Sequence, residues 1–264
     1  MLTAITRGVS PSIAACELTF LPRQTIDLNK SILQHRRYEG CLREFGLRVI
    51  SLAVDPYLPD AVFVEAAAIV LDEVAVVTQM GAETRQREID GVANALAHFR
   101  KIEFLRPPAT LDGGDVMRIG RTLCVGLSSR TNKAAIRQLR KTVRPFGYEV
   151  REVAVNGCLH LKTGCSYVGR NTLLANPEWI DTNHLKDFRL IRVPAAEPWA
   201  ANTLMINETT LVPKSFPQTR RLLENQDFRT RAIDICELQK AEAGLTCLSI
   251  IFEDRLEKPA GARS

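Results

Sequence analysis

The sequence lacks three features that each identify a class of protein: a cysteine pattern for disulfides or zinc, a membrane-spanning segment and a secretory signal. Its seven cysteines are an odd number and include no C-x-x-C pair, which argues against a disulfide framework and a zinc knuckle. No apolar run approaches the length that crosses a bilayer, and the opening MLTAITRGVSPS has only a short apolar patch, which predicts no secretory signal. We therefore expect a soluble protein of a reducing cytoplasm, in which one thiol is free to react.

Blocks of a single charge are absent as well. The net charge is +5, and the basic residues are mixed with acids along the chain. RQTIDLNKSILQHRR and RQLRKTVRP predict amphipathic helices with solvated basic faces. Aromatic residues make up only 6% of the chain, and no RNP-like segment or finger motif accompanies the charge. We therefore expect neither a nucleic-acid partner nor a membrane partner.

Short apolar segments alternate with helical ones from end to end, which predicts an α/β fold built from a repeated strand, strand, helix, strand unit. The 264 residues, 45% of them hydrophobic, suffice for one large core. No linker interrupts the pattern, so residues 1–264 are expected to form a single domain with a frayed tail, EKPAGARS. Paired strands are expected in 66–79, 116–128, 161–176 and 202–216, helices in 83–99, 131–147 and 217–226, and further strands in 102–105 and 151–155.

The segment LDGGDVM, residues 111–117, places two acids around a Gly-Gly pair. Two glycines allow a sharp bend or a close approach of the backbone to another group, and Asp112 and Asp115 leave that bend in different directions. The pattern suits a structural turn, which is the simpler interpretation, and it also suits a site that holds a cation.

Two other segments carry reactive side chains. In CLHLKTGCSYVG, alternation along a strand places His160 and Lys162 on the face opposite the neighbouring leucines, so His160 is a solvent-facing residue or an acid–base group. In AGLTCLSIIF, Cys247 precedes a run typical of a buried strand and is an inert packing residue or a nucleophile. A thiol, an imidazole and the orienting acid Asp112 would form a working set only if the three lie close in space.

Several separate segments carry a resemblance to a known family. LDGGDVM followed by VGLSSRTN, LHLKTG, FPQTR and GLTCLS together resemble the dimethylarginine dimethylaminohydrolases of the guanidine-modifying, or amidinotransferase, superfamily. ITRGVSPSIAACELTFLPRQTIDL and PDAVFVE match the same family, so the similarity covers nearly the whole chain in the family's order. The resemblance implies a single-domain five-bladed α/β propeller of pseudo-repeated ββαβ units around a central active site.

The resemblance also implies a chemistry that needs no cofactor and no metal. Cys247 would be the nucleophile that attacks the guanidinium carbon, and His160 the residue that protonates the leaving amine and later activates water. Asp112 would hold the guanidinium by charge-assisted hydrogen bonds, whereas Asp115 is expected to satisfy backbone N–H groups of the turn, with no catalytic part.

The rest of the pocket is expected to bind an amino-acid head group. Arg85 and Arg130 match the family's carboxylate-binding arginines. Asp60 and the backbone around Leu18, in a loop that resembles the family's mobile lid, match the contacts to the other end of the head group.

One departure from the family pattern concerns the reacting end of the pocket. The family's FVED is FVEA here, so Ala66 stands where the second guanidinium-binding acid is usual, a loss on the order of 3 kcal/mol for a buried cation. Glu65 could replace that acid, although adjacent strand residues point to opposite faces. Alternatively, the pocket accepts a bulkier or differently substituted guanidine or amidine, or the protein has kept binding without turnover.

The leading hypothesis is a cytoplasmic thiol hydrolase of a guanidino amino acid, with N-methylated arginine as the default substrate and citrulline as the product. An arginine deiminase or amidinotransferase is the alternative within the enzymes, and a weakly active protein that binds arginine derivatives is the alternative outside them. The expected partner is thus a small guanidino amino acid, and the resemblance to the family's bacterial-type members makes a homodimer the expected assembly.

Overall fold

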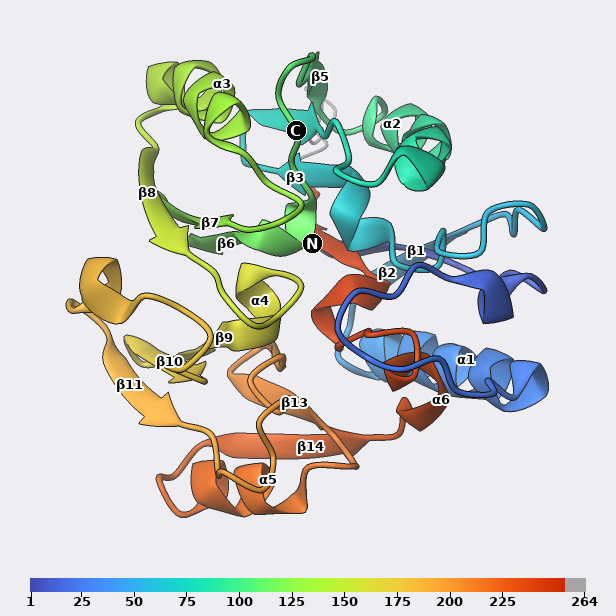
Figure 1. The fold of residues 1–264 in the computed structure, drawn as a ribbon, viewed down its shortest axis with the longest axis vertical. Helices are drawn as coiled ribbons and strands as arrows, with labels where there is room; N and C mark the ends of the chain where they lie inside the picture. The colour runs from blue at the N-terminus through green and yellow to red at the C-terminus, as the bar shows by residue number, and fades with distance from the viewer. Residues whose placement is uncertain (255–264) are drawn as a thin grey trace, which may run out of the picture.

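Five three-stranded sheets lie around a common centre in the computed structural model, which describes residues 1–254 (Figure 1). In each sheet the middle strand pairs antiparallel with one neighbour and parallel with the other. The sheets are, in strand order, β15 (Ile250–Glu253), β1 (Leu2–Arg7) and β2 (Arg48–Leu52); β3 (Ala68–Val70), β4 (Val74–Val77) and β5 (Lys101–Phe104); β6 (Val116–Ile119), β7 (Thr122–Leu127) and β8 (Glu149–Ala154); β9 (Cys165–Gly169), β10 (Thr172–Ala175) and β11 (Arg189–Arg192); and β12 (Leu204–Ile206), β13 (Thr209–Pro213) and β14 (Arg229–Ile233).

The predicted repeat of strand, strand, helix and strand is confirmed, because each sheet has an antiparallel pair followed by a connection to a parallel third strand. A parallel pair needs such a crossover connection. The crossovers are α1 (Leu28–Glu44), α2 (Ile89–Leu96), α3 (Lys133–Val143) and α5 (Pro217–Glu224), and in the fourth sheet only the short 3₁₀ helix Thr182–Leu185. The ring closes where β15, from the C-terminal part, pairs antiparallel with β1. The expected frayed tail lies outside the described residues.

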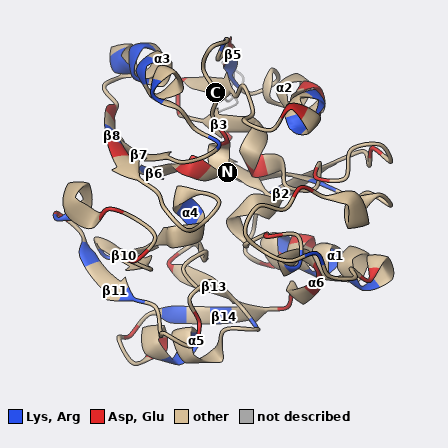
Figure 2. Ribbon diagram, in the orientation of Figure 1, with Lys and Arg blue, Asp and Glu red and all other residues tan. Residues whose placement is uncertain are grey.

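The packing of α3 shows how the sequence pattern selects these elements. Its start is capped by Asn132, whose side chain accepts a hydrogen bond from the backbone N–H of Ala135 at 2.9 Å. Its buried side chains recur at helical spacing, while its Lys and Arg residues lie on the outside of the ring (Figure 2). The solvated basic face predicted for this segment is therefore confirmed.

No helix among residues 1–254 combines the length and the apolar character that crossing a membrane requires.

Two local predictions are wrong. His160 does not lie on a strand: it is the N-cap residue of a single helical turn, α4 (Leu161–Gly164), which begins where Asp115 accepts the backbone N–H of Leu161. Glu65 and Ala66 are not strand neighbours, because Val64–Ala67 forms a 3₁₀ helix. Alternation of apolar and polar residues over three or four positions fits a strand and a tight helical turn alike. These two short helical turns were therefore predicted as strands.

Candidate active site

One small cavity near the centre of the ring gathers the predicted site residues. All of them line it except Leu18, which packs against the hydrophobic core beside α1. The lining residues come from separate segments: Glu17, Asp60, Phe63, Glu65, Ala66, Arg85, Asp112, Gly114, Arg130, Leu159, His160, Ala241, Glu242, Ala243 and Cys247. The volume is about 30 Å³, room for only a few water molecules.

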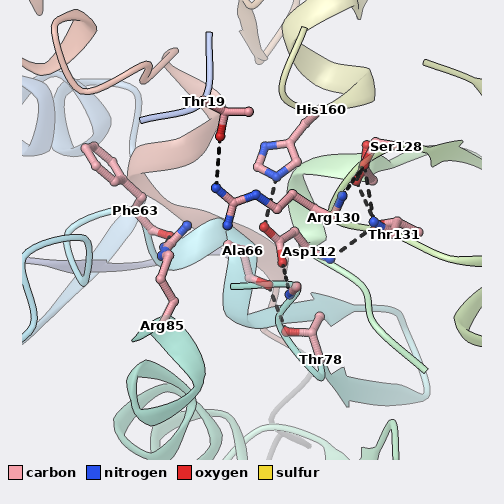
Figure 3. Close-up of polar contacts among 12 residues, drawn as sticks. Thr19, Phe63, Ala66, Thr78, Arg85, Asp112, Ser128, Arg130, Thr131 and His160 are labelled. Carbon is pink, nitrogen blue, oxygen red and sulfur yellow. Dashed lines mark hydrogen bonds and ion pairs between the residues drawn. The ribbon is translucent and has the colours of Figure 1, made fainter. Parts of the chain in front are cut away.

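The LDGGD segment brings its first acid to the imidazole. Asp112 Oδ2 lies 3.0 Å from His160 Nε2, and Oδ1 accepts the backbone N–H of Gly81 at 2.9 Å (Figure 3). Burial opposes the charged form of Asp112, but its hydrogen bond to His160 and the nearby charges hold its pKa below the usual range. The acid is therefore an anion that can orient the imidazole.

Both glycines of LDGGD lie so close to other groups of the protein that a side chain would collide with them. A Cβ on Gly114 would lie 2.5 Å from His160 Nδ1, and a Cβ on Gly113 would lie 2.1 Å from the carbonyl oxygen of Glu65. No side chain fits at either place without displacing the site. The Gly-Gly pair thus serves the cavity and is more than a turn.

Cys247 lies in the 3₁₀ helix Thr246–Leu248, just before β15. Its Sγ accepts the backbone N–H of Gly244 at 3.4 Å. Burial and the charge of Glu65 raise the pKa of the thiol to about 11. In the unliganded protein the sulfur is therefore a neutral thiol near pH 7, and a bound cation would favour the thiolate.

Glu65, which the sequence offered as a replacement for the missing acid despite the strand geometry expected there, lies at the wall of the cavity. Its Oε1 lies 2.5 Å from Lys162 Nζ, and its Oε2 accepts the hydroxyl of Thr246, the residue before Cys247, at 2.7 Å. Two partners therefore fix this carboxylate beside the thiol. Sequence reasoning missed Lys162 and Thr246 because nothing local links them to Glu65.

The two predicted carboxylate-binding arginines both line the cavity but make different contacts. Arg85 is buried, pairs with Glu88 at 2.7 Å, and donates to the carbonyl oxygens of Asp60 and Phe63. Arg130 Nη2 donates to the hydroxyl of Thr19 at 3.1 Å (Figure 3). Arg130 therefore contacts the loop that contains Leu18.

That loop is held down by a residue that sequence reasoning missed. Glu242 Oε1 accepts the backbone N–H groups of Thr19, Phe20 and Leu21 at 2.5 to 2.9 Å. The carboxylate of Asp60 accepts the N–H of Glu17 at 3.0 Å, which fixes the start of the same loop. Glu242 has a left-handed backbone (φ +59°), a conformation that the sequence does not announce in a non-glycine residue.

Residues 1–254 contain no group of three or more His, Cys, Asp or Glu side chains placed to hold a metal ion.

Comparisons with known proteins point to one family. Residues 20–197 match the family model for N,N dimethylarginine dimethylhydrolase, eukaryotic. The chain is 36% identical to the N(G),N(G)-dimethylarginine dimethylaminohydrolase of Streptomyces coelicolor, over 94% of this chain and 95% of that protein. It is 32% identical to the protein of the same name from Pseudomonas aeruginosa, over 86% of this chain and 90% of that one.

A solved structure has the same fold. The Pseudomonas aeruginosa enzyme, a cysteine-to-serine mutant complexed with citrulline, superposes with a TM-score of 0.91 at 30% identity, over 96% of this chain and all of that one. The likeness includes the five-bladed pentein propeller that the strand order shows. The chain is therefore a hydrolase that belongs to the dimethylarginine dimethylaminohydrolase family.

Proposed function

We propose that the protein hydrolyses asymmetrically dimethylated arginine to citrulline and dimethylamine, with Cys247 as the nucleophile. One observation carries the proposal: Cys247, His160 and Asp112 line the same cavity as Asp60 and Arg130, which are suited to the two charges of an amino-acid head group. Relatives named for this reaction share most of the chain's length, which supports water as the acceptor over an amine.

The first half-reaction uses the thiol and the imidazole. The guanidinium of the substrate, held by Asp112, lowers the cost of ionising Cys247, whose pKa is raised to about 11 in the unliganded protein. His160 takes the thiol proton as Sγ attacks the guanidinium carbon. The bond from that carbon to the dimethylated nitrogen breaks, and His160 passes the same proton to the departing dimethylamine.

The second half-reaction returns the enzyme to its starting state. His160 takes one proton from water as the water oxygen attacks the carbon of the thiouronium. The C–S bond breaks to release citrulline, the second proton of that water returns Cys247 to the thiol, and His160 releases its proton to the amine product or to solvent. Asp112, an anion at 3.0 Å from Nε2, orients the ring through both steps. Atoms balance as dimethylarginine plus water giving citrulline plus dimethylamine.

Ala66 supports a methylated substrate over arginine itself. Its methyl group forms part of the cavity wall where an acid would offer hydrogen-bond acceptors. A dimethylated nitrogen has no N–H and needs no acceptor, whereas the free nitrogens of arginine would leave donors unpaired against an apolar wall. The pocket therefore penalises arginine more than its dimethylated form.

The experiment is a product assay on the purified chain. Dimethylarginine, monomethylarginine and arginine are incubated with the wild-type protein and with Cys247→Ser, and citrulline and amines are quantified by mass spectrometry. We expect dimethylamine and citrulline in equal amounts from the wild type, none from the variant, and slower turnover of arginine. Turnover that survives Cys247→Ser, or preference for arginine, would refute the proposal.

A further inference from the structure

Asp115, the second acid of LDGGD, has no part in the chemistry above, yet it is fully buried at the end of the turn that carries Asp112. Sequence reasoning assigned it to the N–H groups of its own turn. Its partners lie elsewhere, in the segments that carry three residues of the site.

Three donors converge on this one carboxylate. Oδ1 accepts the backbone N–H of Leu161 at 2.8 Å, and Oδ2 accepts the hydroxyls of Ser128 at 2.6 Å and Thr131 at 2.7 Å. A Cβ on Gly126 would lie 2.5 Å from Oδ1, so the backbone of β7 also closes around the group. All of these partners donate, so only an acceptor on both oxygens satisfies them.

Each donor continues to a different residue of the proposed site. Leu161 directly follows His160 in the chain. The hydroxyl of Thr131 accepts the backbone N–H of Asp112 at 3.3 Å, and the hydroxyl of Ser128 accepts that of Arg130 at 3.0 Å (Figure 3). The Ser128 hydroxyl also accepts the backbone N–H of Thr131, at 3.2 Å. One buried carboxylate thus fixes the backbone at three points of the cavity.

We propose that Asp115 is a positioning residue, which aligns His160 and Asp112 for the chemical steps and Arg130 for substrate binding. The inference rests on the proposed function for the roles of those three residues. It predicts a different main effect for each of the two hydroxyls, here called arms. The Thr131 arm holds Asp112 and chiefly supports kcat, whereas the Ser128 arm holds Arg130 and chiefly supports KM.

The test removes one arm at a time and measures steady-state kinetics with dimethylarginine. Thr131→Val should lower kcat on the order of tenfold with a smaller change in KM, and Thr131→Ser, which keeps the hydroxyl, should restore it. Ser128→Ala should raise KM on the order of tenfold with a smaller loss of kcat, because Ser128 also accepts the backbone N–H of Thr131. Asp115→Asn, which sets an amide donor against the donors, should show both defects.

The matched control is Thr210→Val, because Thr210 is also a fully buried threonine, lies on β13 and does not line the cavity. It should leave kcat and KM at the wild-type values. The inference is overturned if Thr131→Val behaves like Thr210→Val, or if Thr131→Ser fails to restore kcat. Should Asp115→Asn fail to fold, the two arm variants still decide.

A failure of the proposed function is distinguishable from a failure of the inference. If the wild type turns over no dimethylarginine, the proposed function is wrong, and calorimetric binding of citrulline then tests the inference. Ser128→Ala should weaken that binding and Thr210→Val should not; equal binding by wild type and Ser128→Ala would overturn the role of Asp115.

Discussion

At the scale of single residues, the state of the Cys247 thiol decides how the protein begins its reaction. Burial and the Glu65 carboxylate raise its pKa to about 11, and the N–H of Gly244 offsets only part of that rise. A nucleophile that is neutral until a cation arrives is protected from reaction with neutral electrophiles, since the thiolate is the reactive form.

The pH dependence of alkylation tests this account. Iodoacetamide, which is neutral, should label Cys247 slowly at pH 7, and the rate should climb tenfold per pH unit towards pH 11 because the thiolate fraction does so. A cationic haloacetamidine should label it readily near pH 7. A rate for iodoacetamide that is flat from pH 6 to 9 would indicate a thiolate already formed and would contradict the account.

Ala66 is the second residue with a sharp consequence. Ala66→Asp should tighten the binding of arginine relative to dimethylarginine, on the order of tenfold in KM, because a carboxylate gains hydrogen bonds only from nitrogens that carry hydrogen. In the unliganded state the added buried acid should cost on the order of 1–3 kcal/mol of unfolding free energy. Ala66→Asn is the control, and an equal change in KM from both variants would mean that charge is not the cause.

At the scale of elements, one carboxylate makes the largest set of contacts to the loop that contains Leu18. Glu242 accepts three consecutive N–H groups of that loop, each a charge-assisted bond. Glu242→Ala should accelerate amide hydrogen exchange at Thr19, Phe20 and Leu21 tenfold or more and raise KM, while Glu242→Gln, which keeps an acceptor, should do so less. Unchanged exchange in Glu242→Ala would show that the loop is held by other contacts.

A second element depends on a buried acid for its attachment. Glu237 accepts the backbone N–H of Asp27 at the start of α1 and pairs with Lys30 and Lys240. Burial opposes its charge, but the hydrogen bonds from Lys240, Asp27 and Lys30 lower its pKa to about 2.

A lowered pKa in the folded state stabilises the fold above the pKa of the unfolded chain, and the gain is lost as the pH falls. Between about pH 4.5 and pH 2 the wild type should therefore lose stability through Glu237, on the order of 1 kcal/mol after allowance for solvent screening. Glu237→Gln should be less stable at pH 7 and should lose less than the wild type over that window. Parallel unfolding curves for the two proteins from pH 7 to pH 2 would contradict this assignment.

At the scale of the whole molecule, the repeat could be predicted from the sequence because each strand and helix has its own local pattern of apolar residues. The paired apolar segments around Asp72 and Gly120 became hairpins, and the Asn132-capped segment became α3, since turn residues and helical spacing are local signals. The closure of the ring by β15 against β1 joins residues some 250 positions apart, and no local pattern carries that information.

The site residues likewise divide into those that the sequence identified and those that only the structure reveals. The residue pattern offered Cys247, His160 and Asp112 as candidates, the resemblance supplied their roles, and the structure places all three on one cavity. Asp115 and Glu242 were missed or misassigned because their partners come from distant segments, and the helical turns around His160 and Glu65 were taken for strands because they are only four residues long.

The central claim is that dimethylarginine is cleaved through a covalent bond to Cys247, and mass spectrometry of acid-quenched protein tests it most directly. Wild-type protein mixed with dimethylarginine should gain the mass of the substrate minus that of dimethylamine, located by peptide mapping on Cys247, and Cys247→Ser should gain none. Citrulline formation with no adduct at any time point, or an adduct on another of the seven cysteines, would contradict the account.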